Sequence, residues 1–369
     1  MAPEAFPDAA ALLDRSFRFP PEREPAYSGT RLSPDRFMPF AARLPQLADD
    51  RPPLDPGMAT FRDRIAAETP HEAIHWPFDR QRSAWDAVCR AFHAPHPAGL
   101  AVTDLAIEGT GGPLKVRLYR PQGDAPKPGL LYFHGGGWVL GSLETHDDMC
   151  AEIAAGADIV VAALDYRLAP EHPFPAQLED SHALLAWVLA EGAAHGIDTA
   201  RLIAGGDSAG GQMTAALAGE LRDRGEAVLR GQILIYPVVG TDAETASYRR
   251  NGAESALARE EMLHYLDAFL GPRPSPAWRD KRAVPLLETE FSGLPPAFIT
   301  AAAHDVLQDE AFLYADRLEA AGVPVVLRHE PALDHSYMRA RHHSTAAAAA
   351  FNAIVAAARS LGHDGRLPI

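Results

Sequence analysis

The fold is decided by the stretch Leu202-Ile203-Ala204-Gly205-Gly206-Asp207-Ser208-Ala209-Gly210-Gly211. An apolar run of strand size leads into it, and a helical stretch beginning at Gln212 follows. A G-x-S-x-G pattern between a strand and a helix is typical of a sharp turn that lifts a nucleophilic serine above a sheet. The neighbours are small because a Cβ would strike the adjacent strand or helix, and the helix N-terminus favours negative charge developing near Ser208. A phosphate loop or a plain tight turn is the alternative interpretation, which the strand–turn–helix context disfavours.

A glycine-rich segment upstream is the second signal. His134-Gly135-Gly136-Gly137-Trp138 directly follows the apolar run Leu130–Phe133. Three glycines allow backbone N–H groups to point into a cavity, where they and the N–H of Ala209 could stabilise the oxyanion of a tetrahedral intermediate. A flexible loop is the alternative. Trp138 is expected either to line the alcohol or acyl side of a substrate site or to pack in the core.

A serine nucleophile needs a base, and the base needs a carboxylate that orients it. Asp305 follows the apolar run Ala297–Ala301, and His335 follows the run Pro324–Leu327. Both are therefore expected on loops at the carboxyl ends of strands, where catalytic groups collect in open α/β sheets, and in the chain order serine, acid, histidine. The competing candidates are Asp309 for the acid and His304, His342 and His343 for the base.

Four motifs in this order resemble the hormone-sensitive-lipase family of α/β-hydrolases, in particular its bacterial esterases. They are His134–Trp138, Tyr166–Ala176, Gly206–Gly211, and Asp305-Val306-Leu307 followed by His335. The resemblance covers about residues 101–361. It implies Ser208 as nucleophile, His335 as base and Asp305 as acid. It also implies oxyanion donors from Gly135, Gly136, Gly137 and Ala209, and we expect Trp138 and Asp207 to contact the substrate.

Two features differ from the usual pattern of this family. Ser336-Tyr337 follow the histidine where Gly-Phe is usual, and the region before the first core strand is longer than usual. In this family that region forms a cap over the active site. The extra length is therefore expected to wrap the core, to reshape the acyl pocket or to build a dimer contact.

The texture of the chain agrees with an α/β-hydrolase fold, that is, a central, mostly parallel, eight-stranded sheet flanked by helices and covered by a helical cap. Apolar runs of strand size alternate with amphipathic stretches, which favours a parallel sheet. The runs are Leu114–Tyr119, Leu130–Phe133, Ile159–Leu164, Leu202–Ala204, Gln232–Tyr236, Ala297–Ala301 and Pro324–Leu327. We expect residues 1–100 to form a helical extension and part of the cap, residues 101–369 the catalytic domain, and residues of about 238–292 a cap-type insertion.

Composition excludes several classes of protein. The 369 residues are 47% hydrophobic and 22% charged, which is typical of a globular chain with a large core. The 34 Lys and Arg against 49 Asp and Glu leave a formal charge of −15, which disfavours nucleic-acid binding. Two cysteines are too few for a disulfide framework. We see no signal peptide, and the apolar stretch Ala346–Ala358 is shorter than the ~20 residues of a membrane span, so a cytoplasmic location is expected.

His71-Glu72-Ala73-Ile74-His75 matches the H-E-x-x-H pattern of zinc proteases. That chemistry needs both histidines on one helix face, but Pro70 and Pro77 leave room for barely one turn, so we predict a short exposed helix and no metal. The proline-rich stretch Tyr166–Ala176 is expected to be structural, with an ion pair between Arg167 and Glu171.

The sequence thus predicts a serine carboxylesterase that acts on esters of short to medium acyl chains and needs no cofactor. A small-molecule ester is the expected partner, with no nucleic acid and no membrane span, and a homodimer is possible. Two alternatives stay open: a catalytically silent ligand-binding homologue, and an amidase or peptidase on the same fold.

Overall fold

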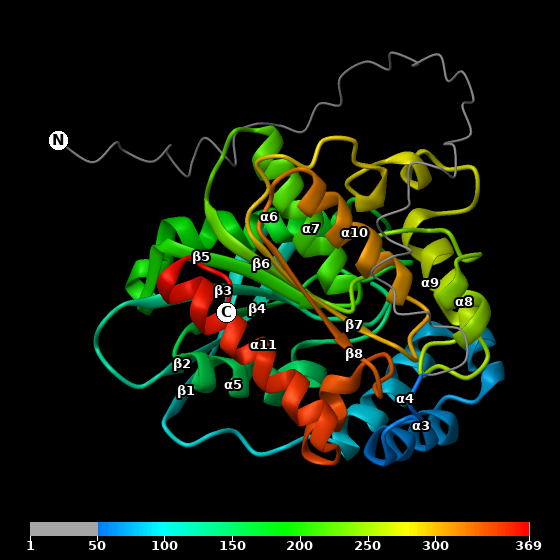
Figure 1. Cartoon of the computed structure of the whole chain (residues 1–369). Coiled ribbons are helices and arrows are strands. Elements are labelled where there is room, and N and C mark those ends of the chain that lie inside the picture. The colour runs from blue at the N-terminus through cyan, green and yellow to red at the C-terminus, as the bar shows by residue number, and fades with distance from the viewer. Residues whose placement is uncertain (1–50, 369) are drawn as a thin grey trace, which may run out of the picture.

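The structure, a computed structural model, describes residues 51–368, so expectations for residues 1–50 lie outside the described part (Figure 1). One sheet of eight strands forms its centre, in the order β1-β2-β4-β3-β5-β6-β7-β8. Strand β2 runs antiparallel to β1 and β4, and all pairs from β4 to β8 are parallel. The predicted fold class is confirmed. The strands are β1 (Leu100–Gly109), β2 (Gly112–Pro121), β3 (Lys127–Phe133), β4 (Val160–Asp165), β5 (Ile197–Asp207), β6 (Leu229–Ile235), β7 (Ala297–Ala302) and β8 (Val325–Glu330).

The central strands form where the sequence is continuously apolar, because both faces of the sheet are covered. Successive side chains of β3 enter opposite layers of the core: Leu131 and Phe133 join one cluster, and Leu130 and Tyr132 the other. Strand β1 lacks such a run and was missed by the pattern of apolar segments. It lies at the edge of the sheet, and only Ile107 among its residues is buried.

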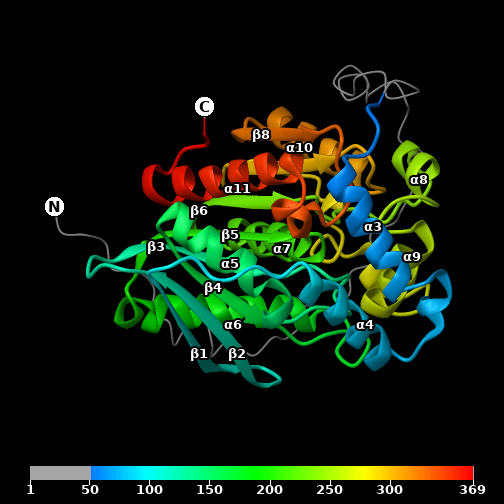
Figure 2. The same cartoon turned by 90° about the horizontal axis from the view of Figure 1, so that it is seen from below.

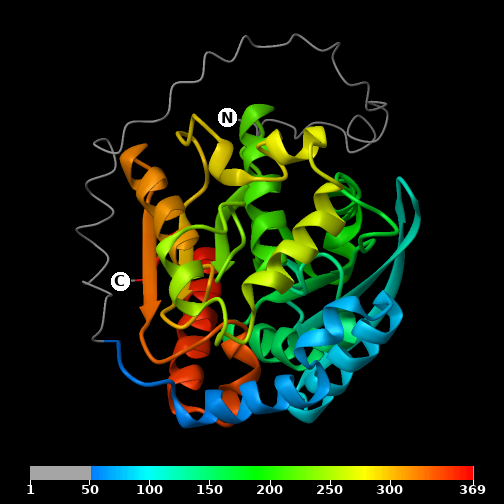
Figure 3. The same cartoon turned by 90° about the vertical axis from the view of Figure 1, so that its right-hand side faces the viewer.

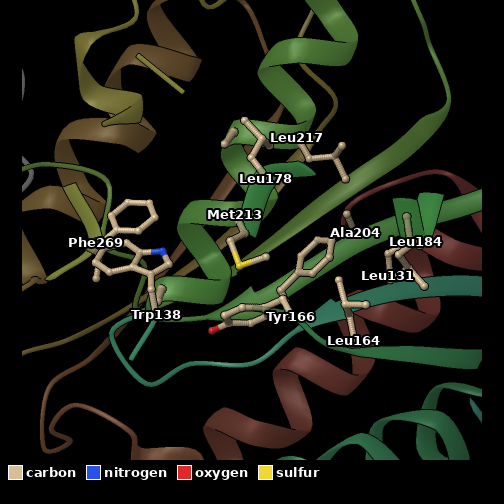
Figure 4. Close-up of a cluster of buried hydrophobic side chains, with 14 of the residues drawn as sticks. Leu131, Trp138, Leu164, Tyr166, Leu178, Leu184, Ala204, Met213, Leu217 and Phe269 are labelled. Atoms are coloured by element: carbon tan, nitrogen blue, oxygen red, sulfur yellow. The ribbon is translucent and has the colours of Figure 1, made fainter. Parts of the chain in front are cut away.

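Helices cover both faces of the sheet (Figures 1 and 2). Side chains of α5 and α11 share one core cluster. Side chains of α6 and α7 share a second, which includes Leu131, Leu184 and Met213 (Figure 4), and those of α10 form a third with part of α7. Helix α11 is long and apolar enough to cross a membrane, yet its inner face, including Phe351 and Ile354, packs on the sheet. The helices are α5 (Leu143–Ala157), α6 (Ala176–Glu191), η3 (Gly192–His195), α7 (Ala209–Asp223), α10 (Gln308–Ala320), η6 (Tyr337–His342) and α11 (Thr345–Asp364).

A second group of helices lies together at one end of the sheet, as all three overall views show (Figures 1, 2 and 3). We call α3, α4, α8 and α9 the cover helices. Two come from the N-terminal region and two from the segment between β6 and β7, so distant parts of the sequence meet here. The elements of these regions are α3 (Pro56–Glu68), η2 (His71–His75), α4 (Phe78–Ala91), α8 (Ala246–Asn251), α9 (Arg259–Leu270), η4 (Pro276–Arg279) and η5 (Pro285–Leu287).

The turn between β5 and α7 is held in an unusual conformation by close packing. Ser208 has φ 55° and ψ −116°, a region that side-chain-bearing residues rarely adopt. A Cβ added at Gly210 would lie 1.9 Å from the carbonyl oxygen of Phe133, at the end of β3. The glycine is therefore required by the close approach of helix α7 to the neighbouring strand.

Replacing this glycine tests the packing of the turn. We expect Gly210→Ala to lower the free energy of unfolding by about 1–3 kcal/mol or more, because the backbone of β3 cannot retreat from the added methyl group. Gly219→Ala, on the same helix with nothing within 4 Å of the added atom, should instead stabilise the chain by about 0.5–1 kcal/mol. Urea unfolding of both variants measures this contrast, and equal stability of the two would contradict the packing argument.

Candidate active site

Three parallel strands deliver three side chains to the same edge of the sheet. Ser208 follows β5, Asp305 follows β7 and His335 follows β8. The Nε2 atom of His335 lies 3.0 Å from Ser208 Oγ, and its Nδ1 atom lies 2.7 Å from Asp305 Oδ2. All three residues are buried, with exposed fractions of 4%, 0% and 6% for Ser208, Asp305 and His335. The structure therefore brings together the three residues that the sequence analysis selected.

The surroundings of His335 favour the protonated form of its imidazole. Burial opposes protonation of His335, but the charge and hydrogen bond of Asp305 outweigh it and raise the pKa of His335 above its ordinary value of 6.5. Asp305 is fixed in turn, because its Oδ1 accepts a hydrogen bond from the Leu307 N–H at 2.9 Å. The side-chain amide of Asn251 donates to the backbone oxygens of Ala303 and Asp305 and holds the same loop.

Backbone donors lie near Ser208, in the glycine loop that lines the same cavity and at the start of helix α7. Within residues 51–368, the N–H groups of Gly136, Gly137 and Ala209 donate to no protein acceptor, and Ala209 begins helix α7. Gly136 has φ 127°, and a Cβ there would lie 2.2 Å from the Leu140 carbonyl oxygen. Gly135 was also expected to donate to the oxyanion. The structure corrects this prediction, because the Gly135 N–H donates to Asp207 Oδ1 at 3.0 Å and is not free for an oxyanion.

Asp207 lies on the cavity wall, but its carboxylate is occupied by protein donors. Its Oδ1 accepts hydrogen bonds from Tyr132 and Gly135, and its Oδ2 lies 3.3 Å from His146 Nε2. Burial alone would raise the pKa of Asp207, yet His146, Arg339 and the hydrogen bond from Tyr132 keep it below the ordinary value. This carboxylate thus joins the serine turn to the glycine loop, whereas a substrate contact was expected from the sequence.

Trp138 is the second expected substrate contact that the structure places elsewhere. Its ring stacks on Phe269 at 4.0 Å between centroids and 5° between planes (Figure 4). The indole N–H donates to Gln212 Oε1 at 3.0 Å, and only 1% of the residue is exposed. Trp138 is therefore a core residue that packs α9 against the glycine loop, and it does not line the cavity.

A cavity of about 770 Å³, its open mouth included, lies between the sheet edge and the cover helices. Ser208, His335 and the glycine loop form its floor, and apolar side chains from α3, η2 and α9 form its walls. Sequence reasoning missed Glu261 and Arg339, which also line it. Burial raises the pKa of Glu261, whose carboxylate accepts from the Ala258 N–H at the start of α9. The one sequence signal for Glu261 was its place as the third residue of helix α9, where a glutamate often accepts a hydrogen bond from the backbone before the helix.

The competing candidates are occupied elsewhere. Asp309 accepts from the Ser247 N–H, and the Nε2 atom of His304 lies 3.1 Å from the Pro52 carbonyl oxygen. His342 pairs with Glu152, and His343 packs on Phe92. Arg167 pairs with Asp180 and Glu179, whereas Glu171 pairs with Arg82, so the expected Arg167–Glu171 pair was wrong.

Two other clusters contain residue types that can bind a metal ion. The His71–His75 segment is a single 3-10 turn, as expected, and His71 pairs with Glu260 at the surface. The imidazoles of His93 and His96 lie near the Asp147 carboxylate, with their ligand atoms within 4.8 Å of one another. Arg117 Nη1 lies 3.0 Å from Asp147 and would repel a cation there. The histidines and carboxylates of both clusters lie outside the cavity lining, to which the His71–His75 segment contributes only Ala73 and Ile74.

Comparisons with known proteins find relatives that are named as ester hydrolases. A family model described as alpha/beta hydrolase fold matches residues 130–339. Esterase LipI of Mycobacterium tuberculosis is 36% identical over 80% of this chain and 91% of its own, and carboxylic ester hydrolase LipN of that organism is 38% identical over 76% and 75%. The solved structure of the Pyrobaculum calidifontis esterase superposes with a TM-score of 0.78 at 32% identity, covering 84% of this chain and 99% of that one.

The Asp305–His335 contact predicts a measurable pKa. We expect the pKa of His335 to lie above 6.5 in the parent chain and to fall in Asp305→Asn, because the charge that offsets burial of the imidazole is lost. Asp309→Asn, which removes the rival carboxylate, should leave it unchanged. NMR titration of the imidazole, assigned with His335→Gln, measures the shift. A larger shift in Asp309→Asn than in Asp305→Asn would reverse the assignment of the acid.

Proposed function

Because this chain belongs to the α/β-hydrolase family, among the esterases of the hormone-sensitive-lipase type, and is a carboxylic ester hydrolase, we propose that it acts through Ser208, His335 and Asp305. The observation that carries this proposal is the pair of contacts made by one imidazole, 3.0 Å to the serine oxygen and 2.7 Å to the carboxylate. An imidazole held between a hydroxyl and a carboxylate is the arrangement that activates a serine nucleophile.

In the proposed first half-reaction, Ser208 Oγ attacks the ester carbonyl carbon while His335 Nε2 accepts its proton. Negative charge develops on the carbonyl oxygen, and the N–H groups of Gly136, Gly137 and Ala209 stabilise it. Removing one such donor in comparable sites costs about 2.7–4 kcal/mol of transition-state stabilisation. The intermediate then collapses, the bond to the alcohol oxygen breaks, and His335 gives its proton to the departing alcohol.

In the second half-reaction, His335 accepts a proton from water, and the resulting hydroxide attacks the acyl carbon bound to Ser208. The same N–H groups stabilise the second tetrahedral intermediate, and the carboxylic acid leaves as Ser208 regains its proton. Asp305 keeps Nδ1 protonated throughout, so that Nε2 faces the serine and the imidazolium is stabilised. Every step uses side chains and backbone of this chain, and none calls for a cofactor.

The substrate class we propose is esters of short to medium acyl chains. The cavity supports this proposal because its walls carry apolar side chains such as Ile65, Leu257 and Met262, and because cover helices close over it. We further propose that the cover helices act as the substrate-covering cap and that the enzyme works in the cytoplasm. A silent ligand-binding homologue is disfavoured, because such a protein has no need of the His335–Ser208 contact.

Hydrolysis of p-nitrophenyl esters of increasing acyl length tests the function. The parent chain should turn over acetate to hexanoate esters, and Ser208→Ala should lose at least about a thousandfold in kcat, because the nucleophile acts with its base as a unit. A fluorophosphonate probe should label the parent chain and not this variant.

Ser336→Ala is the matched control, since it removes a hydroxyl beside His335 without removing the nucleophile. It should keep probe labelling. Undiminished hydrolysis by Ser208→Ala would refute the mechanism, and a preference for long emulsified substrates would move the substrate class toward lipids. Loss of activity on adding a chelator would reopen the metal interpretation of His71–His75.

A further inference from the structure

One buried carboxylate beside the base has no place in the mechanism. Asp334 immediately precedes His335, lies between β8 and η6, and is 0% exposed. Its Oδ1 accepts hydrogen bonds from the His335 N–H and the Ser255 hydroxyl, both at 2.7 Å. Its Oδ2 accepts from Arg62 Nε at 3.0 Å and from the Ala256 N–H at 2.8 Å. A carboxylate with all of these donors is fully satisfied in a buried position.

The four donors come from three distant parts of the chain. Arg62 is on cover helix α3, Ser255 and Ala256 lie in the segment between α8 and α9, and the remaining donor is the backbone of the catalytic loop. Each part also contributes to the cavity wall: Ile65 from α3, Ala256 and Leu257 from the segment, and His335 with Ser336 from the loop. The same carboxylate therefore contacts three of the segments that line the cavity, and one of them is the loop that carries His335.

A second contact ties the N-terminal region to this loop. The Asp55 N–H donates to the Ala332 carbonyl oxygen at 2.9 Å, just before helix α3 begins. The Arg62 side chain is only 25% exposed and the Asp334 side chain 0%, so water competes weakly for this contact. Hydrogen bonds between charged partners at such sites are stronger and more directional than neutral ones.

We propose that Asp334 is a positioning residue that fastens α3 and the 255–257 segment to the loop carrying His335, and so sets the cavity wall and the base together. The inference rests on the proposed esterase function of the same site. Loosening only the cover-helix side should enlarge and soften the cavity, which weakens binding of longer acyl chains. Removing the carboxylate itself should also release the His335 backbone, which slows the chemical step.

Kinetics of Arg62→Met test the cover-helix side. We expect KM for the hexanoate ester to rise by about tenfold, which is the effect of losing the free energy of one charge-assisted hydrogen bond. The change in kcat for the acetate ester should be much smaller. Hydrogen–deuterium exchange should accelerate in residues 56–68. The matched control is Arg64→Met on the same helix, which removes an exposed pair with Glu68 and should stay within about twofold of the parent in KM and exchange.

A double-mutant cycle tests whether the two residues act through one contact. Asp334→Asn should lower kcat as well as raise KM, and Arg62→Met added to it should raise KM by much less than it does alone. Should Asp334→Asn fail to fold, Ser255→Ala gives the second arm, with the same selective rise in KM. An Arg62→Met variant that matches Arg64→Met in KM and exchange refutes the positioning role, while a parent chain that hydrolyses no ester of the series refutes the proposed function instead.

Discussion

Ser208 and His335 are 127 positions apart in the chain and meet because their strands lie parallel in one sheet. In a parallel sheet each connection returns the chain to the same end, so the carboxyl ends of β3, β5, β7 and β8 share one edge. The glycine loop, the serine turn and the loops of Asp305 and His335 are extensions of these four ends. The site therefore depends on backbone pairing inside a core that is buried on both faces, which is the part of a fold least free to shift.

Buried carboxylates fasten the loops at this edge. An isolated buried charge is costly, so each one must be met by donors. Asp207 accepts hydrogen bonds from β3 and the glycine loop, and Asp305 contacts the turn before α10 and His335. Asp334 accepts hydrogen bonds from helix α3, the 255–257 segment and the loop that carries His335. Because the donors of each carboxylate come from different segments, a local hydrogen bond becomes a constraint between distant parts of the chain. Three acidic side chains in this way hold Ser208, the glycine loop, His335 and part of the cavity wall in one arrangement.

Hydrophobic periodicity and the order of the motifs predicted the central strands and the three residues of the site. They did not predict contacts that depend on the direction in which a side chain or a backbone N–H points. Continuous apolar runs marked the central strands, because both faces of those strands are covered, whereas the exposed edge strand β1 left no such run. Motif order selected Ser208, Asp305 and His335. Gly135 was expected to offer its N–H to an oxyanion, but that N–H faces Asp207. Of the two positions expected for Trp138, the structure shows the packed one, with the ring against Phe269. The motif does not record in which direction an N–H or a ring points. Asp334 could not be found, since its partner Arg62 lies 272 positions away.

The residues after the base show how the loop tolerates its departure from the usual Gly-Phe. Ser336 takes φ 58°, a left-handed conformation that costs a residue with a Cβ roughly 1–2 kcal/mol. Tyr337 offsets this cost: it is buried, its hydroxyl donates to Thr300 Oγ1 on β7 at 3.0 Å, and its ring packs on Tyr236, which lies 4.9 Å from the His335 ring. The loop of His335 is thus anchored on both sides, to helix α3 and the 255–257 segment through Asp334 and to the sheet through Tyr337. Because the backbone is held at both neighbours of His335, the proposed role of Asp305 reduces to fixing the tautomer and rotation of the imidazole.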